Sequence, residues 1–260
     1  MIIPRRKKVP IKSDFLAIRH FTIGKYLGDS CFFLTGRINR LLSIFKMVAS
    51  TLFIGSLKGE PVIKIVLPKN RYGPQYGQVW AMKLPPCRSV KLTYEVFFEK
   101  EFDFVKGGKL PGLGGGNCNS GGAIPSGHDG WSCRLMFLES GLLGAYLYYP
   151  LMKTNFGEFT FFSVQDQPFF VKTGQWHLVS IFVLLNDEGN NNGVLNISVD
   201  NEVFFERGAM VFRFGNSLFV DHMLFSCFLG GDDCSWAPQK DQSIYFKNIK
   251  IDSCEDTRSC

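Results

Sequence analysis

The 260-residue sequence lacks the features that mark several common classes of protein. None of its eight cysteines belongs to a C-x-x-C pair, so a zinc site has little support. It contains no recognisable nucleic-acid-binding motif, which argues against a nucleic-acid partner. Charged residues are scarce at 20 % and apolar residues make up 45 %, and this balance excludes a largely disordered chain.

The body of the chain, from about residue 60 onward, also lacks a convincing amphipathic helix and an internal repeat. What it has instead is 27 glycines and 26 phenylalanines, a composition that favours pleated, half-buried strands joined by many turns. Many short strands without intervening helices predict an all-β fold, a sandwich or jelly roll of antiparallel sheets, and not a parallel α/β sheet.

The strand predictions rest on side-chain alternation. Residues 89–99 alternate apolar and polar side chains with a period of two, and residues 176–185 form the continuous apolar run of a strand inside a core. A dense turn signal at residues 186–193 follows. Further strands are expected over residues 194–200, 211–214, 219–228 and 243–251, with a hairpin turn around residues 200–202.

Positive charge is concentrated at the N-terminus. Residues 1–46 carry a net charge of +8, so the remaining 214 residues carry −2. Residues 41–57 form an apolar run interrupted by Lys46, which is marginal for a membrane span. Three interpretations stay open for this run: a secretion signal or anchor, a poorly ordered extension, and ordinary domain structure. The predicted division is a basic N-terminal extension over residues 1–58 and a β-jelly roll domain over residues 59–260.

Six of the cysteines form closely spaced pairs along the chain. If the protein is secreted, these pairs are candidates for disulfides, and the alternative for each pair is buried free thiols. The pairs are Cys118 with Cys133, Cys227 with Cys234, and Cys254 with Cys260.

The most distinctive stretch is the glycine-rich segment at residues 102–116, which contains Lys109. A phosphate-binding loop is excluded, because no Gly-Lys-Ser/Thr closes the segment and no helix is predicted after it. Further blocks follow in order: Trp131-Ser-Cys-Arg134, Tyr146-Leu-Tyr148-Tyr-Pro150, Trp176-His177, Val211-Phe-Arg213, Gly230-Gly231, Ser235-Trp236-Ala-Pro238 and Tyr245-Phe246-Lys-Asn248.

In this order and spacing, the blocks resemble polysaccharide lyase family 14, the alginate and glucuronate lyases of marine molluscs and algal viruses. The resemblance covers roughly residues 62–252. It implies a jelly roll whose concave face holds an acidic polysaccharide, a polyuronate, and cleaves it by β-elimination with no metal and no other cofactor. Carried over by position, the active-site residues are Lys109, Ser132, Arg134, Tyr146 and Tyr148, with Arg213 and Trp236 as further substrate-binding positions.

The residue types fit this chemistry. Ser132 and Arg134 are two apart on a predicted strand, as are Tyr146 and Tyr148, so each pair shares a face of the sheet. Arg134 suits the uronate carboxylate because its guanidinium can bind both oxygens. Elimination also needs a base for the C5 proton and an acid for the leaving oxygen. The base is Lys109 or one of the two tyrosines, and Ser132 orients the substrate by hydrogen bonding.

Two functions of different classes follow. The first is a polysaccharide lyase that leaves 4,5-unsaturated uronate ends, and the second is a non-catalytic glycan-binding or adhesion module on the same fold. Retention of both phenols favours the lyase, since a binder has no need for them. We expect a monomer that is extracellular or at the cell surface, with membrane contact only through residues 41–57.

Overall fold

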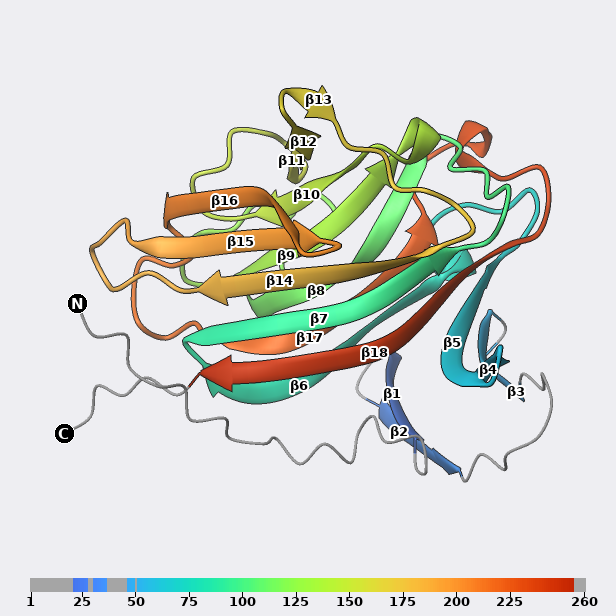
Figure 1. Ribbon diagram of the computed structural model, residues 1–260. Helices are drawn as coiled ribbons and strands as arrows, with labels where there is room; N and C mark the ends of the chain where they lie inside the picture. Colours follow the sequence, from blue (N-terminus) through green and yellow to red (C-terminus); the bar gives the residue numbers. More distant parts are fainter. Residues whose placement is uncertain (1–20, 28–29, 37–45, 50, 255–260) are drawn as a thin grey trace.

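The computed structural model describes residues 21–27, 30–36, 46–49 and 51–254, with side chains described from residue 51 to residue 253. Its main body is a sandwich of two antiparallel sheets that face each other (Figure 1). The described helical elements are three short 3-10 turns, η2 (Pro74–Tyr76), η3 (Glu139–Gly141) and η4 (Cys234–Trp236). The prediction of an all-β jelly roll is confirmed.

One sheet carries the candidate site and has six strands. Their spatial order is β11-β10-β9-β8-β17-β6, and every neighbouring pair is antiparallel. The strands are β11 (Glu158–Phe161), β10 (Leu143–Tyr148), β9 (Gly130–Leu138), β8 (Gly107–Gly116), β17 (Val220–Leu229) and β6 (Gln78–Cys87).

The other sheet has eight strands and covers one face of the first (Figure 1). In spatial order they are β16 (Glu202–Met210), β15 (Gly193–Val199), β14 (Trp176–Leu184), β7 (Ser89–Phe98), β18 (Gln242–Cys254), β5 (Glu60–Leu67), β4 (Leu52–Leu57) and β3 (Lys46–Ala49). Two separate ribbons are β1 (Phe21–Leu27) with β2 (Ser30–Gly36), and β12 (Ser163–Val164) with β13 (Gln167–Pro168).

The core lies between the two sheets. On β7 the alternating side chains expected from the sequence point inward, and Val90, Leu92, Tyr94, Val96 and Phe98 are each at most 1 % exposed. They share one cluster with the inward residues of β9, where the Phe137 ring lies 5.4 Å from the Phe98 ring. The Tyr94 hydroxyl donates to the Pro111 carbonyl 3.1 Å away on β8, so its burial leaves no unpaired donor.

The expected domain boundary at residue 58 needs correction. β4 pairs with β5 from Leu52↔Ile65 to Leu57↔Glu60, and β3 pairs with β4, so the large sheet begins before that boundary. Leu52 is 1 % exposed in the core. Within residues 41–57, therefore, β3 and β4 adopt ordinary domain structure, because their backbones pair into the large sheet. Residues 41–45 lie outside the described residues. Among the described residues, no helix is long and apolar enough to cross a membrane.

A second correction concerns residues 211–214, which do not form a strand. β16 ends at Met210, and the amides of Phe212 and Arg213 donate to the Asn186 Oδ1 atom at 2.9 and 3.2 Å instead of to a neighbouring strand. The apolar pattern was real, since Phe212 is buried against Trp131. The backbone amides of Phe212 and Arg213 are therefore satisfied by a side-chain amide and not by the backbone of a neighbouring strand.

In two of the three candidate disulfide pairs, both cysteines are free thiols. Cys133 points into the core from β9, whereas the Cys118 sulfur lies beside Gly114 on the other face of the sheet. Cys227 is likewise buried in the core and Cys234 is exposed. Burial raises the pKa of Cys118 and of Cys133 to about 12, which keeps both thiols protonated at neutral pH. The side chains of Cys254 and Cys260 lie outside the described residues.

The glycine-rich segment is a strand inside the six-stranded sheet. β8 lies between β9 and β17, and its glycines allow close approach: a Cβ on Gly112 would lie 1.9 Å from the Cys133 carbonyl oxygen. A Cβ on Gly115 would lie 2.0 Å from the Phe219 carbonyl oxygen. On the outer face Gly112 contributes no side chain beside Arg134, and the Cys118 and Leu224 side chains lie next to Gly114.

Candidate active site

The outer face of the six-stranded sheet brings most of the predicted site residues together. Tyr146 on β10 lies directly opposite Arg134 on β9, and Tyr148 lies opposite Ser132. On the other side of β9, Arg134 and Ser132 pair with Gly112 and Gly114 of β8. Because directly paired residues share a face, the two-residue spacing correctly predicted one common surface.

Lys109 approaches this group from near the start of β8. Its Nζ atom lies 3.6 Å from the centroid of the Tyr146 ring and 2.6 Å from the Met136 sulfur. Burial, together with the positive charge of Arg134, lowers the pKa of Lys109 to about 7. An ammonium group loses hydration in such a place and repels a neighbouring guanidinium, so the neutral amine is favoured. Near neutral pH this amine can therefore accept a proton.

Arg134 is a buried cation that the described residues leave without a counter-ion. The residue is 7 % exposed, and its Nε atom is buried with no hydrogen-bond partner. No described carboxylate pairs with it, and its Cζ atom lies 5.9 Å from the Tyr146 ring centroid. Burial lowers the pKa of its guanidinium, but arginine still keeps its charge near neutral pH. An unpaired buried charge is costly, so the site is built to receive an anion.

The two phenols contact each other and two loops. Their hydroxyl oxygens are 3.4 Å apart, and the rings meet edge to face at 5.6 Å. The Gly157 amide donates to the Tyr146 hydroxyl and the Gly122 amide donates to the Tyr148 hydroxyl, both at 3.1 Å. Burial and the adjacent Tyr148 raise the pKa of Tyr146, whereas the Gly157 amide and Arg134 lower it. Because the net shift is upward, Tyr146 stays protonated at neutral pH and is suited to give a proton.

Ser132 and Tyr148 lie beneath the loop at residues 117–129. Each is 1 % exposed, and the Ser132 hydroxyl donates to the Asn119 carbonyl at 2.6 Å. Ser132 therefore anchors the loop. The sequence had suggested that its hydroxyl orients the substrate, but in the structure this hydroxyl is occupied by the loop. Tyr148 is connected to the open part of the site by its hydroxyl contact with Tyr146. The residues at the surface of this group are Lys109 and Tyr146, both partly exposed.

Trp236 lies at the end of the sheet where β8 begins. It belongs to η4, and the Lys106 Nζ atom lies 5.8 Å from its ring centroid. The ring covers Gly230 and Gly231, and the Gly230 amide donates to the Gly107 carbonyl at 3.0 Å. This places Trp236 beside the strand that carries Lys109 but apart from the phenol pair.

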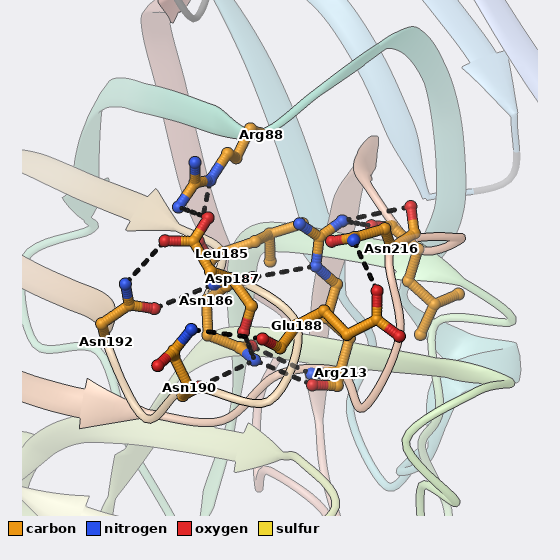
Figure 2. Close-up of polar contacts among 10 residues, drawn as sticks. Arg88, Leu185, Asn186, Asp187, Glu188, Asn190, Asn192, Arg213 and Asn216 are labelled. Atoms are coloured by element: carbon orange, nitrogen blue, oxygen red, sulfur yellow. Dashed lines mark hydrogen bonds and ion pairs between the residues drawn. The ribbon is translucent and has the colours of Figure 1, made fainter. Parts of the chain in front are cut away.

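Arg213 does not join the site. Figure 2 shows its guanidinium directed at backbone carbonyls: Nε donates to the Asn186 carbonyl at 3.1 Å, and Nη1 donates to the Leu218 carbonyl. The Asn186 side chain in turn donates to the Arg213 carbonyl at 2.8 Å. Phe212 beside it packs in the core, and this arginine ties the loop after β14 to the loop between β16 and β17. The geometry indicates a structural role.

Replacing Arg213 with methionine is expected to destabilise the fold by about 2–5 kcal/mol, since it leaves two buried carbonyls without donors. KM for the substrate should not change at temperatures where the variant is folded. Arg207→Met is the matched control, because Arg207 pairs with Glu158 at a more exposed position and should cost under about 1 kcal/mol. Chemical denaturation measures the stability of both variants, and steady-state kinetics measures their KM. A raised KM without loss of stability in Arg213→Met would indicate that Arg213 binds the substrate.

The sequence analysis did not identify two further side chains on the same face, His222 and Lys83. His222 on β17 pairs with Gly114 on one side and with Lys83 of β6 on the other. The Asp221 carboxylate lies 2.7 Å from the His222 Nδ1 atom and also accepts the Gly116 amide. The alternation of β17 breaks here, because a bulge lies between Val220 and His222. Period-two reasoning therefore could not assign His222 to a face.

Within the described residues there is no cluster of three or more His, Cys, Asp or Glu side chains that could hold a metal ion. The groups available for chemistry are an amine, a guanidinium and two phenols. They can neutralise an anion, accept one proton and donate another.

The antiparallel jelly roll and its phenol-lined face agree with the class that the sequence resembles, the polysaccharide lyases. Residues 56–249 match the family model of polysaccharide lyase 14, and the chain belongs to that family. The resemblance seen in the sequence is thereby confirmed. A comparison with curated protein sequences finds no match.

Solved structures support the same fold. A variant of alginate lyase Aly36B in complex with alginate tetrasaccharide is 20 % identical, with a TM-score of 0.70 over 80 % of this chain and 84 % of that one. The PL-14 alginate lyase from Aplysia kurodai is 25 % identical, with a TM-score of 0.68 over 78 % and 87 %. The endo-β-1,4-glucuronan lyase from Trichoderma reesei is 12 % identical, with a TM-score of 0.51 over 90 % and 95 %.

Proposed function

We propose that the protein cleaves a uronate polysaccharide of the alginate or glucuronan type by metal-independent β-elimination. The observation that carries this proposal is Arg134, a buried guanidinium without a counter-ion among the described residues, beside a lysine whose pKa is lowered to about 7. A uronate carboxylate would supply the missing anion. The alginate and glucuronan lyases with the same fold support this substrate class.

Each proposed role follows from the position of one group. Arg134 binds the uronate carboxylate and stabilises the charge that develops when C5 loses its proton. Neutral Lys109 takes that proton, the electron pair forms the C4=C5 double bond, and the C4–O bond breaks. Tyr146 gives its proton to the departing oxygen. Support for this division comes from the opposite pKa shifts of Lys109 and Tyr146.

The polymer would lie across the strands, over the strip of β8 at Gly112 and Gly114, which the Cys118 and Leu224 side chains adjoin. Beyond this strip it would meet His222 and Lys83, which can contact a neighbouring carboxylate, and Trp236 flanks the start of β8 near Lys109. Residues 47–260 carry a net charge of −2, so bulk charge does not attract an acidic polymer to this domain. Local cations on the open face would have to do so.

The direct test is incubation with a panel of polyuronates, including alginate and glucuronan, while the ultraviolet absorbance of the unsaturated product is followed. We expect absorbance to rise with at least one polymer and to be unaffected by a metal chelator. The control is Tyr146→Phe, which keeps the aromatic ring but removes the hydroxyl that is proposed to protonate the leaving oxygen, so it should form less product. Retention of the glycan without any product from the unmodified protein would mean that the fold serves as a binding module instead.

A polymeric substrate also supports an extracellular or cell-surface location, because such a polymer does not enter cells. Sequencing the N-terminus of the mature protein would test whether residues before β3 are removed. We further propose that the protein acts as a monomer, since the open face is complete within one chain, and sedimentation would test this.

A further inference from the structure

Two loops close one end of the open face, and each places a glycine amide on a phenol. The loop at residues 149–157 delivers the Gly157 N–H to Tyr146, and the loop at residues 117–129 delivers the Gly122 N–H to Tyr148. Both donor–acceptor distances are 3.1 Å. Neither contact could be anticipated from side-chain types, because backbone groups make both.

The close approach of the first loop depends on the absence of a side chain. A Cβ on Gly157 would lie 2.6 Å from Cζ of Tyr146 and 2.6 Å from Cε2 of Tyr148. The two loops also meet each other, since a Cβ on Gly122 would lie 3.5 Å from the Phe156 ring. The phenols are therefore held from one side by a pair of packed backbone segments.

These contacts fix where the phenol protons point. A backbone N–H only donates, so the Tyr146 and Tyr148 oxygens must both accept from their glycines. Tyr148 is 1 % exposed, and the acceptor within reach of its proton among the described residues is the Tyr146 oxygen at 3.4 Å. In the arrangement with Tyr148 as the donor, Tyr146 accepts from both Gly157 and Tyr148, and its own proton is directed toward the open face.

We propose that the Gly122 and Gly157 amides are positioning groups that make Tyr146 a one-directional proton donor and stabilise the phenolate it becomes. When Tyr146 gives its proton to the leaving oxygen, its negative charge is held by the Gly157 N–H. Gly122 acts one step further back, by holding Tyr148 in place. This inference rests on the proposed elimination and assigns how its acid is prepared.

The test compares two leaving groups at C4. The usual sugar oxygen needs a proton to depart, whereas fluoride at C4 of a uronate unit leaves without one. We expect Gly157→Ala and Tyr148→Phe each to lower kcat about 10–100-fold on the ordinary substrate. KM should change less than about twofold, because neither group touches the carboxylate. On the fluorinated substrate both variants should react at the unmodified rate.

Gly208→Ala is the matched control, since a Cβ at Gly208 meets no atom within 4 Å and the residue lies on β16. Tyr148→Phe keeps the ring packing, so it remains informative if Gly157→Ala fails to fold. Equal losses on both substrates would show a general collapse of the site and overturn the proposal, as would full activity of both variants. If the unmodified protein processes neither substrate, it is the elimination itself that fails.

Discussion

Replacing Lys109 with alanine is expected to lower kcat by about 10²–10⁴-fold, the usual contribution of a general base. The Nζ atom lies against the Tyr146 ring, so the base and the acid reach the same linkage. An ordinary lysine is neutral in roughly one molecule in 2,500 at pH 7, whereas a pKa of about 7 makes half of the amines available as a base. Steady-state product formation measures the loss. Lys250→Ala is the control, because Lys250 pairs with Asp252 on the other sheet.

The same assignment predicts the pH profile. Lys109 must be neutral to act, so kcat/KM of the unmodified protein should rise with pH through about 7 and level off above it. Lys109→Arg should not restore activity, since a guanidinium does not give up its proton in this range. A flat profile between about pH 5.5 and 8.5, or a Lys109→Ala variant that retains the rise, would contradict a lysine base.

Much of the fold could be predicted from side-chain alternation. The strands β7, β14, β15, β17 and β18 lie within a few residues of their predicted bounds because one face of each is buried in the core. The prediction failed at residues 211–214, where buried apolar residues are held by the Asn186 side chain and no sheet hydrogen bonds form. It also did not foresee β8 as a strand. Its glycines are typical of turns, and only the packing of neighbouring backbones explains them.

The candidate site shows the same division. A period of two placed Ser132 with Arg134 and Tyr146 with Tyr148 on common faces, and the register of β9 and β10 brings the pairs together. What could not be predicted is which of them reach the surface. The burial of Ser132 and Tyr148 comes from the path of the loop at residues 117–129, which side-chain alternation does not predict, and the lowered pKa of Lys109 depends on burial and on Arg134.

Replacing Arg134 with methionine is expected to change activity and stability in opposite directions. Removal of the group that neutralises the carboxylate should lower kcat/KM by about 10²–10³-fold. The same change removes a buried charge with an unpaired Nε atom and fills its space with apolar atoms. We therefore expect the variant to be about 1–4 kcal/mol more stable, with a higher Tm.

A second consequence separates this charge effect from simple loss of binding. The positive charge of Arg134 helps to lower the pKa of Lys109, so its removal should raise that pKa and move the acid limb of the residual activity to higher pH. Arg134→Lys, which keeps the charge but loses the bidentate geometry, should leave the limb near pH 7 while still impairing kcat/KM. Denaturant titration measures the stability of the variants, and pH-dependent kinetics measures the position of the acid limb. A destabilised Arg134→Met variant with an unshifted limb would mean that Arg134 supports the fold and not the charge balance of the site.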